Sequence, residues 1–157
     1  MIFAAASNRG SGHELFPANH ETVFSIRATN DEGTHEKSNP SLPERGESVF
    51  GTLGVEVPAW NRGNLTPREI NRTGSSVATA IAAGIAAIVL GYINTQEGKR
   101  SWDNIKTYGG FQKLLYELST VKGTQERFFS LENHFEEENR EAFEQALDNA
   151  SNLRKKR

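Results

Sequence analysis

The sequence predicts an α/β fold with a mostly parallel sheet, followed by a helical C-terminal extension. Short apolar or alternating runs that end in polar and glycine residues predict strands at residues 2–6, 22–28 and 51–58. An uncharged, proline-free run at residues 77–93 predicts a long helix after these strands. Because the first run is apolar, it is typical of a central strand with neighbours on both sides.

The predicted strands differ in how they end. The first (IFAAA) stops at the turn-forming stretch SNRG, and the second (TVFSIRA) alternates apolar and polar residues before a turn-rich stretch. The third is stopped by Pro58, because proline cannot donate to a sheet ladder. Residues 34–48 are expected to form a surface loop, and residues 60–73 are polar and irregular.

Helices are expected in the second half of the chain. The run at residues 77–93 is rich in alanine and contains Gly84 and Gly91, so we expect a buried helix that neighbours approach closely on all sides. After Asn94 the sequence becomes amphipathic and charged, which predicts surface helices. These helices are expected at residues 111–119, 125–135 and 139–153, and in the last of them Ala142, Phe143, Ala146, Leu147 and Ala150 recur at helical spacing.

Composition excludes several classes of function. The 157 residues carry a formal net charge of −2 and 24% charged residues, so a polyanionic partner such as nucleic acid is not expected. No cysteine is present, which excludes a disulfide framework, a thiolate nucleophile and a cysteine-based zinc site. The N-terminal apolar stretch is too short for a signal-peptide core, and the localisation stays open.

A turn of small residues, Gly74-Ser75-Ser76, stands directly before the predicted buried helix. A serine at a helix N-terminus lies near unpaired backbone N–H groups and the positive end of the helix dipole, which favour a developing negative charge. Ser76 is therefore a candidate nucleophile for acyl transfer. The competing interpretation is that Ser75 or Ser76 merely caps the helix.

Two motifs, in this order along the chain, resemble the subtilisin-like serine peptidases. Residues 4–10 (AAASNRG) are similar to the family's A-A-G-N stretch, and residues 74–80 (GSSVATA) resemble its nucleophile motif, G-T-S-x-A-x-P. Asn8 falls on the residue whose side-chain amide donates to the oxyanion, and Ser76 falls on the nucleophile. The intervening segments FPA (16–18), VFSIRAT (23–29) and GVEVP (54–58) follow the family's order, so the resemblance covers about residues 2–93.

This resemblance implies the C-terminal portion of a three-layer α/β/α domain, in which the Ser76 hydroxyl attacks the scissile carbonyl while Asn8 and the Ser76 N–H bind the oxyanion. Three positions depart from the family's pattern. Ser75 replaces the usual threonine, and Ala80 replaces a proline near the helix start. Ser7 replaces a glycine that lines the substrate pocket, which puts the substrate choice in doubt.

The resemblance supplies only half of a catalytic site. The family's Asp and His motifs lie upstream of the Asn stretch, and only seven residues precede Asn8. None of the four histidines matches the catalytic one by order or context: His13, His20, His35 and His134. We therefore expect a serine endopeptidase that is inactive alone, with a missing N-terminal catalytic segment and a peptide or protein substrate as its partners. The alternative is a non-catalytic remnant that binds peptides or a protein partner.

The expected organisation is a partial catalytic domain at residues 1–93 and a helical extension at residues 94–157. No cofactor and no metal are expected, because the histidines and neighbouring glutamates give no pair on one helix face. The apolar run of 17 residues is at the short limit for a membrane span and only weakly hydrophobic, so no membrane partner is expected.

Overall fold

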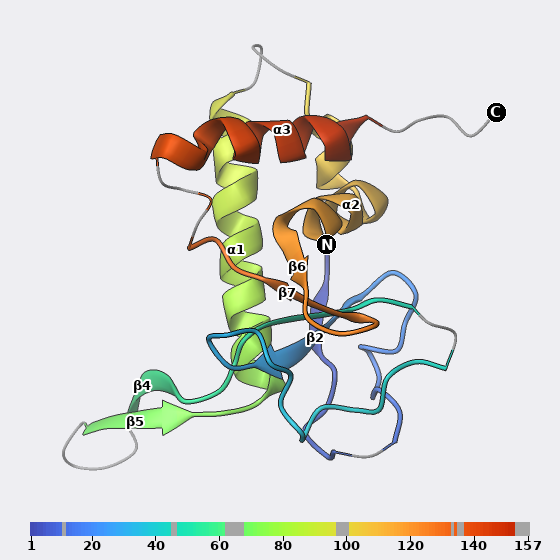
Figure 1. The fold of residues 1–157 in the computed structure, drawn as a ribbon, viewed down its shortest axis with the longest axis vertical. Helices are drawn as coiled ribbons and strands as arrows, with labels where there is room; N and C mark the ends of the chain where they lie inside the picture. The colour runs from blue at the N-terminus through green and yellow to red at the C-terminus, as the bar shows by residue number, and fades with distance from the viewer. Residues whose placement is uncertain are drawn as a thin grey trace.

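The computed structural model describes residues 1–10, 12–44, 47–61, 68–96, 101–132, 134 and 137–152. Its main sheet has five strands in the order β1-β2-β3-β7-β6. Neighbours β1, β2, β3 and β7 are parallel, whereas β6 runs antiparallel to β7 (Figure 1). The predicted α/β class with a mostly parallel sheet is confirmed. The strands are β1 (Phe3–Ala5), β2 (Phe24–Thr29), β3 (Val49–Leu53), β6 (Ser119–Val121) and β7 (Glu126–Phe129).

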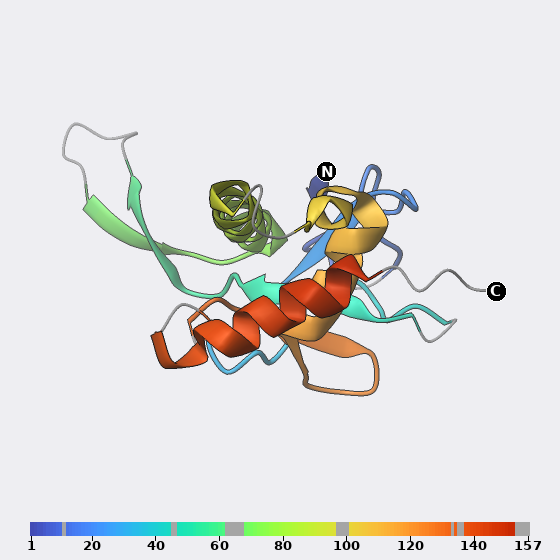
Figure 2. The same ribbon diagram turned by 90° about the horizontal axis from the view of Figure 1, so that it is seen from above.

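Three α-helices pack around one face of this sheet. Helix α1 (Ser75–Thr95) lies along β1, β2 and β3, and α2 (Tyr108–Leu118) packs beside it on the same face. Helix α3 (Arg140–Ser151) crosses over both, as Figure 1 and the view from above in Figure 2 show. Two short 3-10 helices, η1 (Asp103–Lys106) and η2 (Glu137–Asn139), precede α2 and α3. These elements enclose one apolar core.

Loops cover the opposite face of the sheet. Arg27 of β2 is buried there, where its guanidinium pairs with Glu14 at 3.2 Å and donates to the carbonyl oxygens of Pro40 and Ser41. Buried charge of this kind is tolerated when it is paired and hydrogen-bonded. The second helical layer of the expected three-layer architecture does not lie among the residues that the structure describes.

The helix expected at residues 125–135 is wrong for the part of it that the structure describes. Residues Glu126–Phe129 form strand β7, which inserts between β3 and β6, and Phe129 lies in the core. The open edge of β3 offers a full ladder of hydrogen-bond partners, and such tertiary pairing overrides weak local propensity. Residues 133 and 135, at the end of the expected helix, lie outside the described residues.

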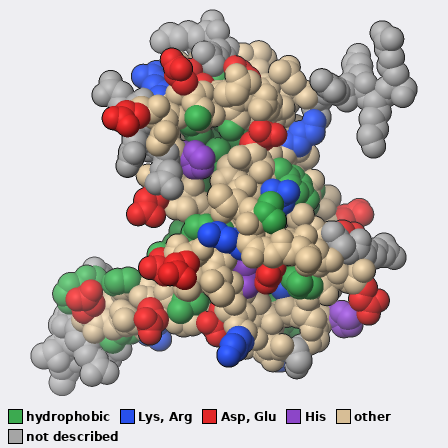
Figure 3. Space-filling model, in the orientation of Figure 1, with side chains coloured by type: hydrophobic (Ala, Val, Ile, Leu, Met, Phe, Trp, Pro, Cys, Tyr) green, Lys and Arg blue, Asp and Glu red, His purple; other side chains and the backbone are tan. Residues whose placement is uncertain are grey.

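Pro58 does not end a strand. The third strand ends earlier, at Leu53, and Pro58 lies inside β4 (Val57–Asn61), which pairs with β5 (Arg68–Arg72) as an antiparallel hairpin. A two-stranded hairpin consists only of edge strands, where proline is tolerated. This arm projects from the body of the molecule and exposes hydrophobic side chains, including Trp60 (Figures 1 and 3).

Helix α1 is not packed on all sides, contrary to the expectation. Small residues permit close approach on every side, but only one face meets the sheet and the other helices. The buried residues are Ser75, Ala78, Ala82, Ile85, Ala86, Val89 and Ile93, and the opposite face exposes Ala80, Ala83, Gly84, Ala87, Ile88 and Gly91.

Helix α1 is also the one described helix long and apolar enough to cross a membrane. Its most apolar window has a mean hydropathy of 2.1, and 28% of that window is buried inside the protein. Because its inward face belongs to the core of a folded domain, the helix needs no membrane to explain its composition. The absence of a membrane partner stays a prediction.

The two halves of the chain share one sheet and one core. Strand β7, from the second half, pairs with β3 from the first, and Phe111 of α2 packs edge-on against Phe3 and Phe24. The amphipathic periodicity of α3 is confirmed for Phe143, Ala146, Leu147 and Ala150, which are buried, whereas Ala142 is exposed. The division of the chain at residue 94 stays a prediction.

Candidate functional site

Asn8 and Ser76 lie at the same edge of the sheet. Asn8 follows the carboxyl end of β1, and Ser76 lies in the first turn of α1. The N–H of Gly74 donates to the carbonyl oxygen of Gly54 at 2.8 Å, which ties the start of α1 to the chain just after β3. The carboxyl ends of parallel strands gather at one edge, where open α/β sheets bind their ligands.

A hydrogen bond joins the two motifs directly. The side-chain oxygen Oδ1 of Asn8 accepts from the backbone N–H of Ser75 at 2.7 Å. An N–H donor requires an oxygen acceptor, so this bond orients the amide and leaves the NH₂ group of Asn8 as its donor end. The Asn8 side chain is thereby held against the residue that precedes Ser76.

The backbone N–H groups in the first turn of α1 differ in their hydrogen bonding. The N–H of Ser75 is bonded to Asn8, and those of Val77 and Ala78 both donate to the carbonyl oxygen of Gly74. The N–H of Ser76 has no acceptor among the described residues. No acidic residue in this turn offsets the positive end of the helix dipole. This arrangement suits an anion or a developing oxyanion.

Capping does not explain the two serines. The N-cap residue is Gly74, which makes no side-chain cap bond, and the buried Oγ of Ser75 has no hydrogen-bond partner. Ser76 is exposed to solvent, as a nucleophile must be. The interpretation of Ser75 or Ser76 as a simple helix cap is therefore wrong, because neither hydroxyl accepts from the first turn.

Two glycines determine how closely these parts approach. Gly74 has φ of +148°, which side chains rarely adopt, and a Cβ there would lie 3.0 Å from Nδ2 of Asn8. A Cβ at Gly54 would lie 2.8 Å from the Cβ of Ala78, so this glycine lets α1 sit directly on the end of the sheet. Gly74 stands in the predicted turn before the helix, whereas no role was predicted for Gly54, whose place at the end of a strand was the available signal.

The histidines and carboxylates of the described residues lie away from Ser76. None of their histidines or carboxylates forms a hydrogen bond with Ser76. His20 bonds Thr22, His134 lies beside Phe143, and His35 lies 3.9 Å from a carboxylate oxygen of Glu126. No group of three histidine or acidic residues within the described ranges is placed to hold a metal ion.

No protein-family model and no curated protein matches the sequence. Solved structures do resemble it. A mutant of the protease domain of PatA matches with a TM-score of 0.65 and 17% identity, over 92% of this chain and 47% of PatA's domain. The PatG macrocyclase in complex with peptide gives 0.65 and 16%, over 91% and 42%. The prenylagaramide maturation protease PagA gives 0.62 and 20%, over 78% and 42%.

This chain spans less than half the length of each of these proteins. At such low identity the likeness concerns the backbone arrangement alone. All three proteins are subtilisin-like protease domains, and their likeness includes the mostly parallel sheet of this chain. The chain therefore has the fold of part of a subtilisin-like serine protease domain.

Proposed function

We propose that this chain carries the nucleophile and the oxyanion donors of a serine endopeptidase. Ser76 supplies the attacking hydroxyl, and the Asn8 NH₂ group and the Ser76 N–H bind the oxyanion. The observation that carries the proposal is the 2.7 Å bond from the Ser75 N–H to Asn8, because it brings two motifs 67 residues apart into one place. The substrate is a peptide, and the peptide complex of the PatG macrocyclase is consistent with that class.

In the proposed reaction, the Ser76 oxygen attacks the scissile carbonyl while a histidine takes its proton. The carbonyl oxygen becomes negatively charged and accepts from the two donors, which lie at the positive end of α1. Collapse of this intermediate releases the amine, which takes the proton from the histidine, and leaves an acyl group on Ser76. Water then releases the acid and regenerates the hydroxyl.

The histidine and its aspartate come from a complementary catalytic segment, which is part of the proposal. Two surfaces support it. Among the described residues, the apolar strand β1 pairs only with β2, so it lies at an edge and not at the predicted central position. The outward face of α1, with its small and apolar residues from Ala80 to Gly91, is uncovered. A parallel strand and a helix from that segment fit these two surfaces.

The proposal predicts that the chain alone does not turn over peptide. Enzymes of this kind that lack the triad's histidine retain only about 10³–10⁴ over the uncatalysed rate. Incubating the purified chain with a fluorogenic peptide tests this. Robust turnover that is abolished by Ser76→Ala would contradict the need for a complementary segment.

Labelling by a fluorophosphonate probe tests the nucleophile itself. In the longest natural translation product that contains this chain, we expect labelling that Ser76→Ala removes and Ser101→Ala, at an exposed serine outside the site, leaves unchanged. Labelling that persists in Ser76→Ala would place the nucleophile elsewhere. The absence of any labelling would contradict the proposal that the protein is an enzyme.

The second candidate function is a non-catalytic remnant that binds peptides or a protein partner. It is favoured by one observation, that no described histidine or carboxylate bonds Ser76. The coding sequence upstream of Met1 separates the two: an in-frame segment with Asp and His motifs of the family favours the peptidase. A remnant would bind peptide equally well after Ser76→Ala, without ever being labelled.

A further inference from the structure

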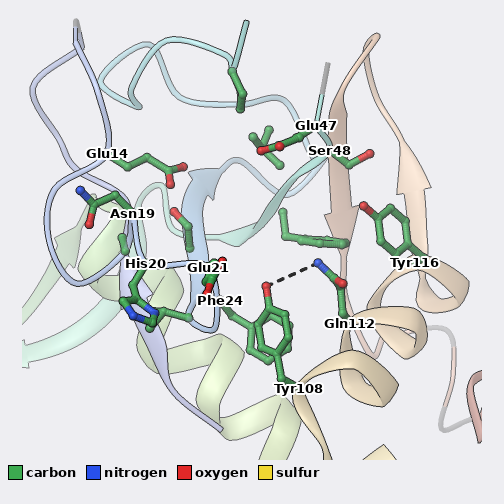
Figure 4. Close-up of a pocket in the computed structure, with 16 residues that line it drawn as sticks. Glu14, Asn19, His20, Glu21, Phe24, Glu47, Ser48, Tyr108, Gln112 and Tyr116 are labelled. Carbon is green, nitrogen blue, oxygen red and sulfur yellow. Dashed lines mark hydrogen bonds between the residues drawn. The ribbon is translucent and has the colours of Figure 1, made fainter. Parts of the chain in front are cut away.

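A cavity lies at the opposite edge of the sheet from Ser76. It has a volume of about 500 Å³ and is lined by the beginnings of β2 and β3, at Phe24 and Val49, together with the side of α2 (Figure 4). Because β1 and β2 are parallel and Phe3 pairs with Phe24, this edge is the one from which the strands start. Asn8 follows the end of β1, so the cavity is separate from the acyl-transfer site.

Aromatic rings form one wall of the cavity. Tyr108 stacks on Phe24 with ring centroids 4.5 Å apart, and Tyr116 meets Phe50 edge-on at 5.1 Å. The guanidinium of Arg127 lies 4.6 Å from the centroid of the Tyr116 ring. Ring faces attract cations through their quadrupole, as the contact of Arg127 with Tyr116 illustrates.

Carboxylates stand around the same space. Glu14, Glu21 and Glu47 line it, and among the described residues no lysine or arginine does. Glu14 is paired with the buried Arg27, whereas Glu21 and Glu47 have no ion-pair partner among the described residues. In Figure 4 the side chains of Glu14 and Glu47 point toward one another across the space, with Tyr108 below them. The cavity is therefore acidic.

The carboxylates and the aromatic wall of the cavity are close enough to interact electrostatically. Burial raises the pKa of Tyr108, and the neighbouring Tyr116 and the charge of Glu47 raise it further. A ligand that is cationic and rich in N–H donors would satisfy the unpaired carboxylates.

The cavity continues into a neighbour of about 570 Å³. The two share Glu14, Asn19, Pro43 and Glu47, and the second adds Glu44 and the buried Arg27, which is paired with Glu14. The joined space is larger than one amino-acid side chain requires, so it suits a short stretch of extended chain. A bare metal ion fits it less well, because the wall is largely aromatic and no described set of three acidic or histidine residues is placed for a metal.

We propose that this acidic aromatic cavity binds an arginine side chain carried on an extended peptide segment. The guanidinium stacks on Tyr108 and pairs with Glu47, and the flanking peptide lies in the adjoining space. Arginine suits the site better than lysine, because its planar group both stacks on rings and donates several hydrogen bonds. This binding requires neither Ser76 nor Asn8.

Fluorescence anisotropy with a fluorescein-labelled Gly-Arg-Gly amide tests the proposal on the full chain. The matched peptide carries citrulline, which keeps the shape of arginine without its charge. We expect Glu47→Gln and Tyr108→Leu each to weaken arginine-peptide binding about twofold to fivefold, as single ion pairs and cation–π contacts at accessible sites do. Tyr108→Phe keeps the ring face, and Glu138→Gln removes an exposed carboxylate of η2 outside the cavity; both should bind like the wild type.

Three results would overturn the proposal: no binding of the arginine peptide, equal binding of the citrulline peptide, or an unchanged Kd in Glu47→Gln. Melting curves accompany each variant. Glu47 is exposed, so its substitution is a test even where Tyr108→Leu fails to fold. Ser76→Ala should leave the binding unchanged, which separates this site from the proposed peptidase.

Discussion

The two ends of helix α1 are held by different kinds of contact. At its start, small residues and backbone groups meet: Gly54, Gly74 and Asn8 fix the first turn through two hydrogen bonds. At its other end, Tyr92 packs between large rings, stacking on Trp102 at 6.1 Å and meeting Phe143 edge-on at 5.5 Å.

Polar side chains lock this aromatic end further. The indole N–H of Trp102 donates to Asp148 at 2.7 Å, and the Tyr92 hydroxyl donates to Glu144 at 2.6 Å. Burial of large apolar surface supplies most of the stability of a domain, at about 25 cal/mol per Å². The difference teaches that the second half of the chain anchors the helix whose first turn carries the proposed chemistry. Substitutions at the two ends should therefore change different properties.

The largest loss of stability is expected at the anchoring end. Leu147 of α3 is fully buried in the core, and Leu147→Ala should lower the free energy of unfolding by about 2–5 kcal/mol through lost burial and the cavity left behind. Urea denaturation measures this. Glu141→Gln, at an exposed position of the same helix, should stay within about 0.5 kcal/mol of the wild type. A loss below about 1 kcal/mol for Leu147→Ala would contradict the anchoring role.

Smaller changes in stability, opposite in sign, are expected from substituting two glycines, one just before α1 and one within it. Gly74→Ala forces an alanine to φ of +148° and presses on Asn8, which should cost about 1–3 kcal/mol. Gly84→Ala, at an exposed position with open space around it, should stabilise the helix by about 0.4–1 kcal/mol. Thermal melting of both variants provides the check. Equal shifts would show that the first turn does not require glycine.

The convergence of the Asn8 and Ser76 motifs was more predictable from the sequence than much of the fold. Asn8 and Ser76 stand in short motifs that can be recognised locally. Asn8 is a polar residue just after a predicted strand, and Ser76 lies in a turn just before a predicted helix. Their convergence depends only on parallel strands ending at one edge. Gly54 was not given a role, because its function is an approach to Ala78, distant in sequence.

The parts of the fold that were predicted wrongly depend on contacts with distant segments of the chain, which local sequence patterns do not reveal. The stretch ERFF in β7 has no decisive period, and only the open edge of β3 makes it a strand. Pro58 was predicted to end a strand because the hairpin partner, β5, is polar and shows no regular strand pattern in the sequence. The composition of α1 indicates close packing but does not say which face is covered.

A modest dependence on pH is expected from His35, which lies beside Thr29, Gly51 and Glu126 at the main sheet. Burial lowers its pKa below the ordinary 6.5; the charge of Glu126 opposes this, and that of Arg27 adds to it. A lowered folded-state pKa favours the neutral ring, so this stability is present above about pH 6.5 and is lost as the pH falls further. His35→Gln should flatten the decline in unfolding free energy between pH 6.5 and 5, and an unchanged slope would contradict it.

The central claim is that Asn8 does more than satisfy the first turn of α1, and Asn8→Asp separates the two roles. Aspartate keeps an oxygen for the Ser75 N–H and suits the helix dipole, but it removes the NH₂ donor. The measurement is the rate of fluorophosphonate labelling of Ser76, in the longest natural product that contains this chain. We predict an unchanged melting temperature and a rate about 10²–10³ lower, the usual cost of one oxyanion donor. A variant that labels as fast as the wild type would show that Asn8 is only a structural cap.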